Sequence, residues 1–205
     1  MTPDVASLAV DFPGRSPGAA VPDTAMDEDG RVLEASVREP DRFTVIFDRY
    51  FGQVHAYVAR RLGIDIADDL AAETFLIAFR QRERFDRRNG VVRAWLYGIA
   101  TNLIRRHRRD EVRAWRAIAK LPLPVPVGAP EDRTAAQVTA QVASREIAAA
   151  LAKLSTKDRE VLLLVALGDL TYDEVAAALG IAYGTVCSRL SRARRTLRAT
   201  LEDPS

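Results

Sequence analysis

The sequence predicts an all-α protein with two small helical domains, a helical bundle and a helix-turn-helix, joined by a flexible linker rich in proline. Three observations carry this prediction. Apolar residues recur at three- and four-residue spacing over most of the chain after residue 40. The strict alternation of apolar and polar residues that is typical of a half-buried strand occurs nowhere. The run LPLPVPVGAP at 121–130 cannot continue a helix and favours an extended conformation, which marks a domain boundary.

Length and composition are those of a protein with one or two domains and real hydrophobic cores. The chain has 205 residues, of which 48% are hydrophobic, and a net charge of +2. Cys187 is its single cysteine, so no intramolecular disulfide can form and a reducing compartment is expected. No apolar run approaches the roughly 18 residues of a membrane span, and the N-terminus lacks a secretory pattern. We therefore expect a soluble, cytoplasmic protein with no membrane insertion.

Residues 1–40 are expected to form a disordered, acidic extension rich in proline. This segment holds five prolines and the acidic run DEDG at 27–30, and no helical period persists in it. Within this extension, a short helix near Val32 to Val37 is the alternative to disorder. Charge is sorted along the chain, because Met1 to Arg42 contains four arginines against nine acidic residues.

Residues 41–117 are predicted to form a bundle of three helices. The first runs from Phe43 to a stop at Gly63, with aromatic and aliphatic residues at helical spacing. The second contains LAAETFLIAFRQ and begins with aspartates, which the helix dipole favours at an N-terminus. The third follows the polar loop FDRRNGVV and runs roughly from Arg93 to Arg116.

The third predicted helix and the loop before it are strongly basic. Twelve arginines and four acidic residues lie between Arg80 and Arg116. Four of these arginines fall within five residues: Arg105, Arg106, Arg108 and Arg109. Such a cluster favours contact with phosphate over a merely solvated face. Trp95 lies on the apolar side of this helix and is expected in the core, not stacked on a base.

Residues 118–135 are predicted as the linker and 136–201 as the second domain. Ser155 is expected to cap one helix, and Thr171 with Glu174 forms a capping box at the start of another. Gly180 then permits the tight turn of a helix-turn-helix.

The last predicted helix is suited to the major groove of DNA. Val186 and Leu190 would bury one side of it, which leaves a side rich in serine and arginine facing outward. No acidic residue occurs between Ala182 and Leu201. This pattern indicates that the second domain binds DNA.

Both halves of the chain resemble the extracytoplasmic-function sigma factors, which are specificity subunits of bacterial RNA polymerase. The N-terminal resemblance is carried by DDLAAETFLIAF at 68–79 and RAWLYGIATNLIRRHRR at 93–109. The C-terminal resemblance is carried by LSTKDREVLLL and LTYDEVAAALGIAYGTVCSRLSRAR. It implies a factor that binds core polymerase, recognises the −10 and −35 elements of promoter DNA and promotes melting, without any cofactor. It also implies an anti-sigma factor as a partner, which the sequence does not identify.

The resemblance also implies which residues make each contact. Polymerase would be bound by Asp69, Leu70, Glu73 and Phe75. The −10 element would be bound by Arg88, Asn89, Arg93, Asn102, Arg105, Arg106 and Arg109. The −35 element would be bound by Tyr183, Thr185, Ser188, Arg189, Arg192 and Arg195. A plain solvated helix face remains the alternative for Asp69 and Glu73, and a plain polar surface residue remains the alternative for Asn102.

Two positions depart from the family pattern where the family tends to meet −35 DNA. Cys187 stands where arginine is common in GTVRSR, and Val165 stands where an arginine often closes the preceding helix. We expect a different −35 preference or a weaker upstream contact. A redox role for Cys187 is the alternative, but a small residue tolerated at this position is the favoured interpretation, because the chain has no second cysteine that could resolve an oxidised thiol.

Two other classes of function were weighed against this one. The acidic residues lack the spacing of an EF-hand, and no phosphate loop or nucleophile elbow occurs, so we expect no catalytic residue, no metal site and no enzymatic activity. A helix-turn-helix repressor or activator that acts without polymerase is the alternative, and it would bind a palindrome as a dimer. An acidic helix followed by an arginine-rich helix argues against that alternative in the N-terminal half.

Overall fold

The computed structural model is all-helical over the residues that it describes, which are 23–86, 90–118 and 150–202. The N-terminal helices are α2 (Asp23–Ala35), α3 (Phe43–Leu62), α4 (Ile64–Gln81) and α5 (Val92–Ile118), with short 3-10 helices η1 (Pro40–Arg42) and η2 (Arg82–Arg84). The C-terminal helices are α7 (Thr156–Gly168), α8 (Tyr172–Leu179) and α9 (Tyr183–Glu202). The all-α prediction of two helical domains is confirmed. Residue 118 ends α5, and the rest of the predicted linker, 119–135, lies outside the described residues.

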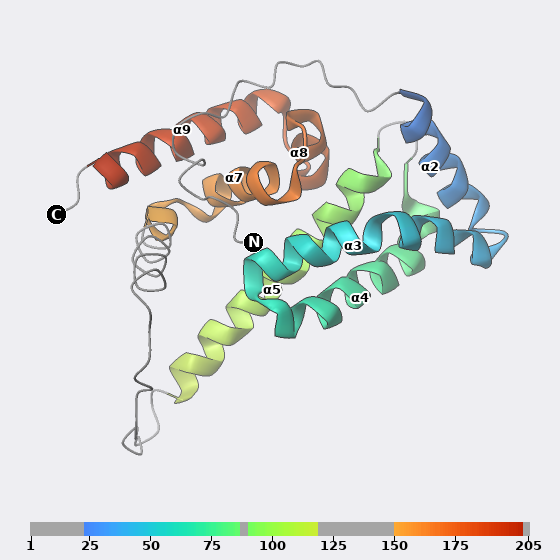
Figure 1. The fold of residues 1–205 in the computed structure, drawn as a ribbon, viewed down its shortest axis with the longest axis horizontal. Coiled ribbons are helices and arrows are strands. Elements are labelled where there is room, and N and C mark those ends of the chain that lie inside the picture. Colours follow the sequence, from blue (N-terminus) through green and yellow to red (C-terminus); the bar gives the residue numbers. More distant parts are fainter. Residues whose placement is uncertain (1–22, 87–89, 119–149, 203–205) are drawn as a thin grey trace, which may run out of the picture.

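The N-terminal domain is built on the pair α3 and α4, with α5 packed across both (Figure 1). Val54 and Tyr57 of α3 and Leu96 of α5 are almost completely buried between these helices. The Tyr57 hydroxyl lies 3.1 Å from the Thr101 hydroxyl, and Arg61 donates to the Tyr57 oxygen at 2.7 Å. The buried hydroxyls of Tyr57 and Thr101 therefore have partners inside this core.

Helix α2 is longer and begins earlier than the short helix considered near Val32 to Val37 in the extension that was otherwise expected to be disordered. Leu33 of this helix is fully buried in the core, and α2 packs on α3 and α5. Asp29 is 4% exposed, accepts a hydrogen bond from the Tyr50 hydroxyl and pairs with Arg49. The sequence of α2 contains few apolar residues, so its periodicity is weak, and tertiary contacts decide its structure. Residues 1–22 lie outside the described part of the chain.

The C-terminal domain has the predicted caps and the predicted turn. The Ser155 hydroxyl accepts from the Asp158 amide at 3.1 Å, and Thr171 and Glu174 form the complete capping box of α8. Gly180 ends α8 with φ of 61°, in the left-handed region that glycine tolerates best. Val186 and Leu190 are buried, which seats α9 against α7 and α8. The helix-turn-helix prediction is confirmed.

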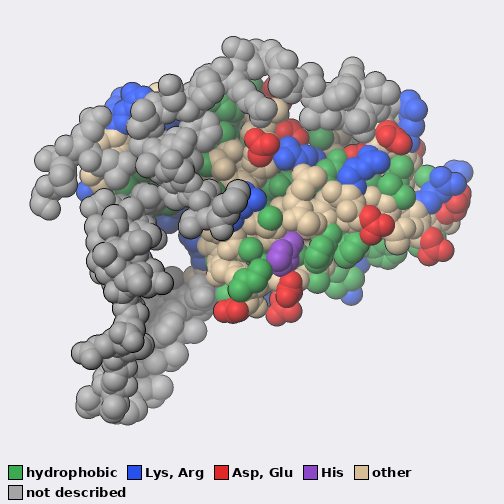
Figure 2. Space-filling model, viewed as in Figure 1, with side chains coloured by type: hydrophobic (Ala, Val, Ile, Leu, Met, Phe, Trp, Pro, Cys, Tyr) green, Lys and Arg blue, Asp and Glu red, His purple; other side chains and the backbone are tan. Residues whose placement is uncertain are grey.

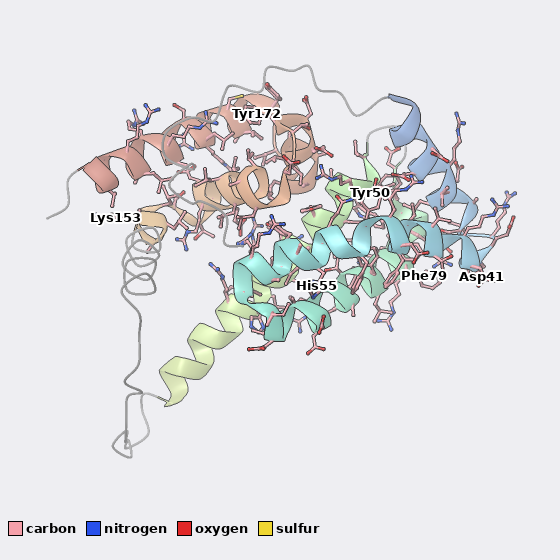
Figure 3. All side chains as sticks on the ribbon, in the orientation of Figure 1. Asp41, Tyr50, His55, Phe79, Lys153 and Tyr172 are labelled. Carbon is pink, nitrogen blue, oxygen red and sulfur yellow. The ribbon has the colours of Figure 1, made fainter. Side chains whose placement is uncertain are left out.

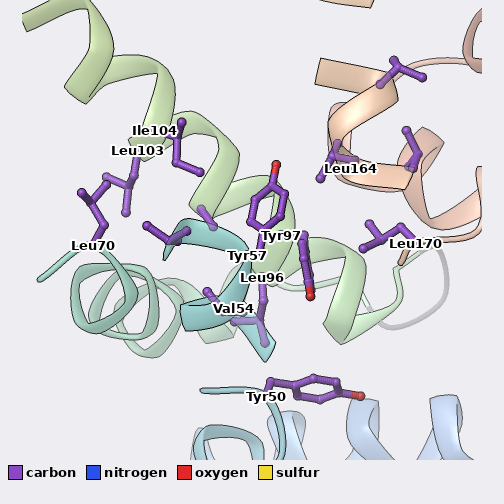
Figure 4. Close-up of a cluster of buried hydrophobic side chains, with 14 of the residues drawn as sticks. Tyr50, Val54, Tyr57, Leu70, Leu96, Tyr97, Leu103, Ile104, Leu164 and Leu170 are labelled. Carbon is purple, nitrogen blue, oxygen red and sulfur yellow. The ribbon is translucent and has the colours of Figure 1, made fainter. Parts of the chain in front are cut away.

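The two domains pack directly against each other, which the sequence did not predict. Helix α5 contacts both α7 and α8, and α3 contacts α7. Figure 4 shows Leu164 and Leu170 on the side of the C-terminal domain that faces Tyr97 of α5. A Cβ atom at Gly98 would lie only 2.6 Å from the Ala178 carbonyl oxygen, so the two backbones meet at this glycine. The buried hydrophobic residues of both domains form one continuous cluster.

Candidate nucleic-acid interface

Helix α9 presents a polar face whose direction is fixed by its buried side. Val186, Leu190 and Ala193 are buried against the domain core. The predicted −35 residues Tyr183, Ser188, Arg192 and Arg195 are exposed, and Thr185 and Arg189 are half-buried. Figure 3 shows nitrogen-tipped side chains on the outer side of α9, away from α7. A helix held in this way can enter a major groove with its basic side forward.

Asp158 of α7 forms an ion pair with Arg192, one of the exposed arginines of α9. Arg192 donates to Asp158 of α7 at 3.0 Å, and Arg192 remains about half exposed. Burial acts to raise the pKa of Asp158, but the hydrogen bonds with Arg192 and Ser155 outweigh it and leave that pKa below its usual value. The pair fixes the Arg192 side chain over the start of α7.

The predicted −10 residues on α5 lie along a face that points to the C-terminal domain at one edge and to solvent at the other. Asn102, Arg106 and Arg109 are exposed. Arg105 is half-buried and donates to the Asn102 side-chain oxygen at 3.4 Å. Burial, followed by the charge of Arg61, lowers the pKa of Arg105. Arg88 and Asn89 lie outside the described residues.

Arg93, another predicted −10 residue, is engaged by the C-terminal domain. Its Nη1 donates to both carboxylate oxygens of Glu174, at 3.0 and 3.1 Å. Its Nη2 donates to the Gly168 carbonyl at 2.9 Å, and both nitrogens reach the Asp169 carbonyl. Its Nε donates to the Gln53 side chain at 3.3 Å. All three guanidinium nitrogens therefore already have acceptors.

Arg105 is engaged in the same way by a second acidic residue. It forms an ion pair with Glu160 of α7, whose side chain is 3% exposed. Arg60 of α3 adds a bond of 2.7 Å to the Leu167 carbonyl, near the C-terminus of α7, where the helix dipole favours a cation. Sequence reasoning missed Glu160, Glu174 and Arg60 as interface residues. The sequence held one signal for a role of Glu160: this acidic residue directly precedes the apolar run VLLLVAL, where burial is expected.

The predicted polymerase-binding residues of α4 divide into two faces. Asp69 and Glu73 are exposed, but Leu70 and Phe75 are only 6% and 3% exposed, so the prediction that these two form a contact surface is wrong. The Phe75 ring packs against Phe47 and Phe51 of α3, at centroid distances of 5.1 and 5.7 Å.

The apolar residue that accompanies the exposed acids is Leu76, which is 47% exposed. Residues 69, 73 and 76 share one helical face because they are separated by four and three positions. Figure 2 shows acidic and hydrophobic side chains interspersed on this side of the molecule, over α3 and α4. The exposed face of α4 is therefore both acidic and apolar.

Three other residues discussed from the sequence, Trp95, Cys187 and Val165, are half-buried. Trp95 is half-buried, with its ring 5.2 Å from that of Phe85, as expected of a packing residue. Cys187 is a half-buried free thiol, and Val165 is half-buried on α7. Among the described residues, no group of three potential metal ligands comes together and no helix is long and apolar enough to span a membrane.

Family models match both halves of the chain. The model for Sigma-70 region 2 matches residues 46–116, and the model for Sigma-70 region 4 matches residues 144–197. The first match covers α3 to α5, and the second covers the helix-turn-helix with α7. The two matches occur in the order that the sequence motifs led us to expect.

Curated relatives match over most of their length. The extracytoplasmic-function (ECF) RNA polymerase sigma factor SigL of Mycobacterium tuberculosis is 33% identical over 174 residues, which are 84% of this chain and 96% of SigL. The ECF RNA polymerase sigma factor SigW of Bacillus subtilis is 32% identical over 184 residues, which are 84% of this chain and 96% of SigW.

A solved structure has the same arrangement of helices. It is the structure of CnrH in complex with the cytosolic domain of CnrY, with a TM-score of 0.59 and 28% sequence identity. The match covers 86% of this chain and 99% of that one.

Proposed function

Because this chain belongs to the extracytoplasmic-function family of RNA polymerase sigma factors, we propose that each of its three surfaces makes one contact of a transcription initiation complex. Helix α9 binds the −35 element, α5 with the loop before it binds the −10 element, and the exposed face of α4 binds core polymerase. The observation that carries this division is that one chain presents two separate basic faces and one acidic, apolar face.

The −35 element is bound as a duplex by the outer side of α9. Ser188, Arg192 and Arg195 are exposed there, and the buried Val186 and Leu190 keep them facing outward. Arginine can pair with a guanine edge through two hydrogen bonds or hold a phosphate. Cys187 and Val165, which are both half-buried, take no charge to this DNA, so its upstream contact is weaker than an arginine would provide.

The −10 element is bound by Arg93, Asn102 and the arginines that follow on α5. The exposed Asn102 offers a donor and an acceptor to the edge of an unpaired base. Arg106 and Arg109 hold the strand by charge. Flipping a base out of the stack costs a few kcal/mol, which these contacts offset in the melted promoter.

Core polymerase is bound by Asp69, Glu73 and Leu76. Exposed acids guide association with a basic partner and fix its orientation, and an exposed leucine supplies apolar burial at the centre of the contact. RNA synthesis belongs to the polymerase, so the proposed role requires no catalytic group from this chain.

An anti-sigma factor is a further proposed partner. The solved structure of CnrH contains the cytosolic domain of CnrY, and this chain shares the fold of CnrH. Since polymerase and promoter DNA are in the cytoplasm, the chain acts there.

The experiment that tests this function is co-elution with core RNA polymerase on a size-exclusion column. A sigma factor elutes with the core enzyme in a one-to-one complex. A regulator of the helix-turn-helix class elutes apart from the core, as a dimer. Elution apart from core at every concentration tested would refute the sigma assignment and favour the regulator.

A further inference from the structure

We propose that Asp158 of α7 sets the base specificity of the −35 contact, because it holds Arg192 of α9 in the orientation that reads one guanine. This inference rests on the proposed function, since it takes the outer side of α9 as the surface that binds the −35 duplex. Asp158 acts on the DNA through Arg192, so it is a positioning residue.

The contact between these two side chains has two hydrogen bonds. Arg192 donates from Nη2 to one carboxylate oxygen of Asp158 at 3.0 Å, and from Nε to the other oxygen at 3.4 Å. A paired contact of this kind fixes the plane of the guanidinium as well as its position, which a single hydrogen bond does not.

Asp158 is itself held in place by its own helix. It stands in the first turn of α7, its backbone amide donates to the Ser155 hydroxyl at 3.1 Å, and its side chain is only 13% exposed. Burial disfavours the charged carboxylate, but the hydrogen bonds with Arg192 and Ser155 outweigh it and keep the pKa of Asp158 below its usual value. The acid is therefore ionised at neutral pH and pairs with Arg192 before any DNA is bound.

The edge of Arg192 that Asp158 leaves open is the edge that can read guanine. A guanidinium carries five N–H donors. The contact with Asp158 takes the donor of Nε and one donor of Nη2, which leaves the second donor of Nη2 beside a donor of Nη1 on the next edge. Two parallel donors match the O6 and N7 acceptors of guanine in the major groove. The Arg192 side chain is 49% exposed, so a base can approach this edge.

Arg195 shows the contrast between a fixed and a free arginine on this face. It is exposed three positions after Arg192, and no acid in the described part of the chain forms an ion pair with it. A free arginine loses rotamer freedom when it binds, and it can hold a phosphate as readily as a base. Arg192 has already lost that freedom, so Arg192 is the arginine that distinguishes one sequence from another.

The substitution Asp158→Ala tests the proposal, with Asp173→Ala as the matched control. Both substitutions remove one acidic charge from the first turn of a helix in the C-terminal domain, and both introduce the strongest helix former. Asp173 is exposed on α8. A loss of negative charge near DNA therefore affects both variants, whereas a loss of Arg192 orientation affects Asp158→Ala alone.

Base preference is measured with the full-length chain bound to core polymerase. The wild-type complex and each variant complex select duplex DNA from a library of random sequence, and sequencing of the bound DNA gives the preference at each position. Arg192→Ala identifies the position that Arg192 reads.

The expected result is a loss of preference at that one position. A paired contact between arginine and guanine is worth about tenfold in the choice between bases, and we expect this preference in the wild type and in Asp173→Ala. Ordering a free side chain on binding costs about two- to tenfold in affinity, so Asp158→Ala should lose about that much of the guanine preference.

The proposal is overturned if Asp158→Ala keeps the full guanine preference, because Arg192 is then positioned without the acid. It is overturned equally if Arg192→Ala loses no preference, or if Asp158→Ala and Asp173→Ala lose it alike. Should Asp158→Ala fail to fold by circular dichroism, Asp158→Asn takes its place, since the asparagine NH₂ group cannot accept the second hydrogen bond. Failure of the proposed function is seen separately, as failure of the wild-type chain to form the complex with core polymerase.

Discussion

Asp29 is the residue that fixes α2 on the N-terminal domain. A buried carboxylate is costly unless it is paired and hydrogen-bonded, and Asp29 has the Tyr50 hydroxyl and the Arg49 guanidinium as partners. Figure 4 shows Tyr50 next to α2, apart from the main cluster of buried side chains. Burial, with the neighbouring charge of Asp29, raises the pKa of Tyr50 well above its ordinary value.

Removing the Tyr50 hydroxyl is expected to destabilise the chain. Tyr50→Phe leaves a buried oxygen of Asp29 without its donor, so the free energy of unfolding at pH 7 falls by about 1–3 kcal/mol in urea denaturation. Because the folded pKa of Tyr50 is raised, its contribution is present below the unfolded pKa of about 10 and is lost as pH rises through the folded pKa. Wild type therefore loses stability relative to Tyr50→Phe in strong alkali.

The control for this prediction is Tyr183→Phe. Tyr183 is 40% exposed on α9, so removal of its hydroxyl changes stability little. Equal stability of Tyr50→Phe and wild type at pH 7 would show that the Asp29 contact does not hold α2.

The local hydrogen bonds of capping side chains were easier to predict from the sequence than the side of a helix that is buried. The caps at Ser155 and Thr171 follow from side chains that bond their own local backbone, and both are present. Leu70 and Phe75 were assigned to a partner surface by resemblance alone, although their spacing places them among the apolar residues that seat α4 on α3.

At the scale of elements, the start of α7 depends on a single local bond. Ser155 supplies the acceptor for the Asp158 amide, which has no partner within the helix. Ser155→Ala is expected to lower the free energy of unfolding by about 1 kcal/mol, and Ser155→Asp to restore most of it, because aspartate also caps. Denaturation curves of the three proteins check this, and equal midpoints for alanine and serine would contradict it.

The exposed face of α4 gives a second element-scale prediction. Leu76→Ala is expected to weaken binding to core polymerase by about tenfold, because it removes apolar area from the proposed contact and little from the core. Val45→Ala is the matched control, since Val45 is 42% exposed on α3 and outside that face. Binding is measured by fluorescence titration, and equal weakening in both variants would remove α4 from the polymerase contact.

The helices themselves were largely predictable, with one exception. The strong periodicity of α3, α4 and α5 gave their positions to within a few residues. The extent of helix α2 was missed, because the local pattern before Val32 favours disorder. The order of this helix comes from Leu33 and Asp29, which contact residues far along the chain.

At the scale of the whole molecule, the proposed DNA binding depends on the local clustering of arginines and not on the net charge of the chain. The basic residues of α5 belong to a chain whose net charge is only +2, so non-specific attraction to DNA is modest and local. Two of these residues, Arg106 and Arg109, are exposed on α5.

Promoter binding is expected to depend less on salt when these arginines are removed. Each arginine that holds a phosphate in the wild type contributes about 0.7–0.9 to the slope of log affinity against log salt, so replacing Arg106 and Arg109 with alanine lowers that slope. Filter binding of the reconstituted complex at several salt concentrations measures the slope. Binding to core polymerase should not change, and an unchanged slope would place the phosphate-binding residues elsewhere.

The contact between the domains could not be predicted from the sequence. Arg93 and Glu174 are 81 residues apart, and each has a complete local explanation, one as a basic helix residue and the other as a capping-box acid. The fit of Gly98 to Ala178 likewise depends on two backbones and not on a pattern of side chains. Such contacts appear only once both domains are folded.

The central claim is that this chain directs RNA polymerase to promoters, and in vitro transcription tests it most directly. Purified core polymerase is incubated with genomic fragments, including the region upstream of this chain's own coding sequence, with and without the chain. We predict discrete start sites that appear only when the chain is present and that share two spaced sequence elements. If the chain binds the same DNA but does not change transcription by core polymerase, the result would contradict the account.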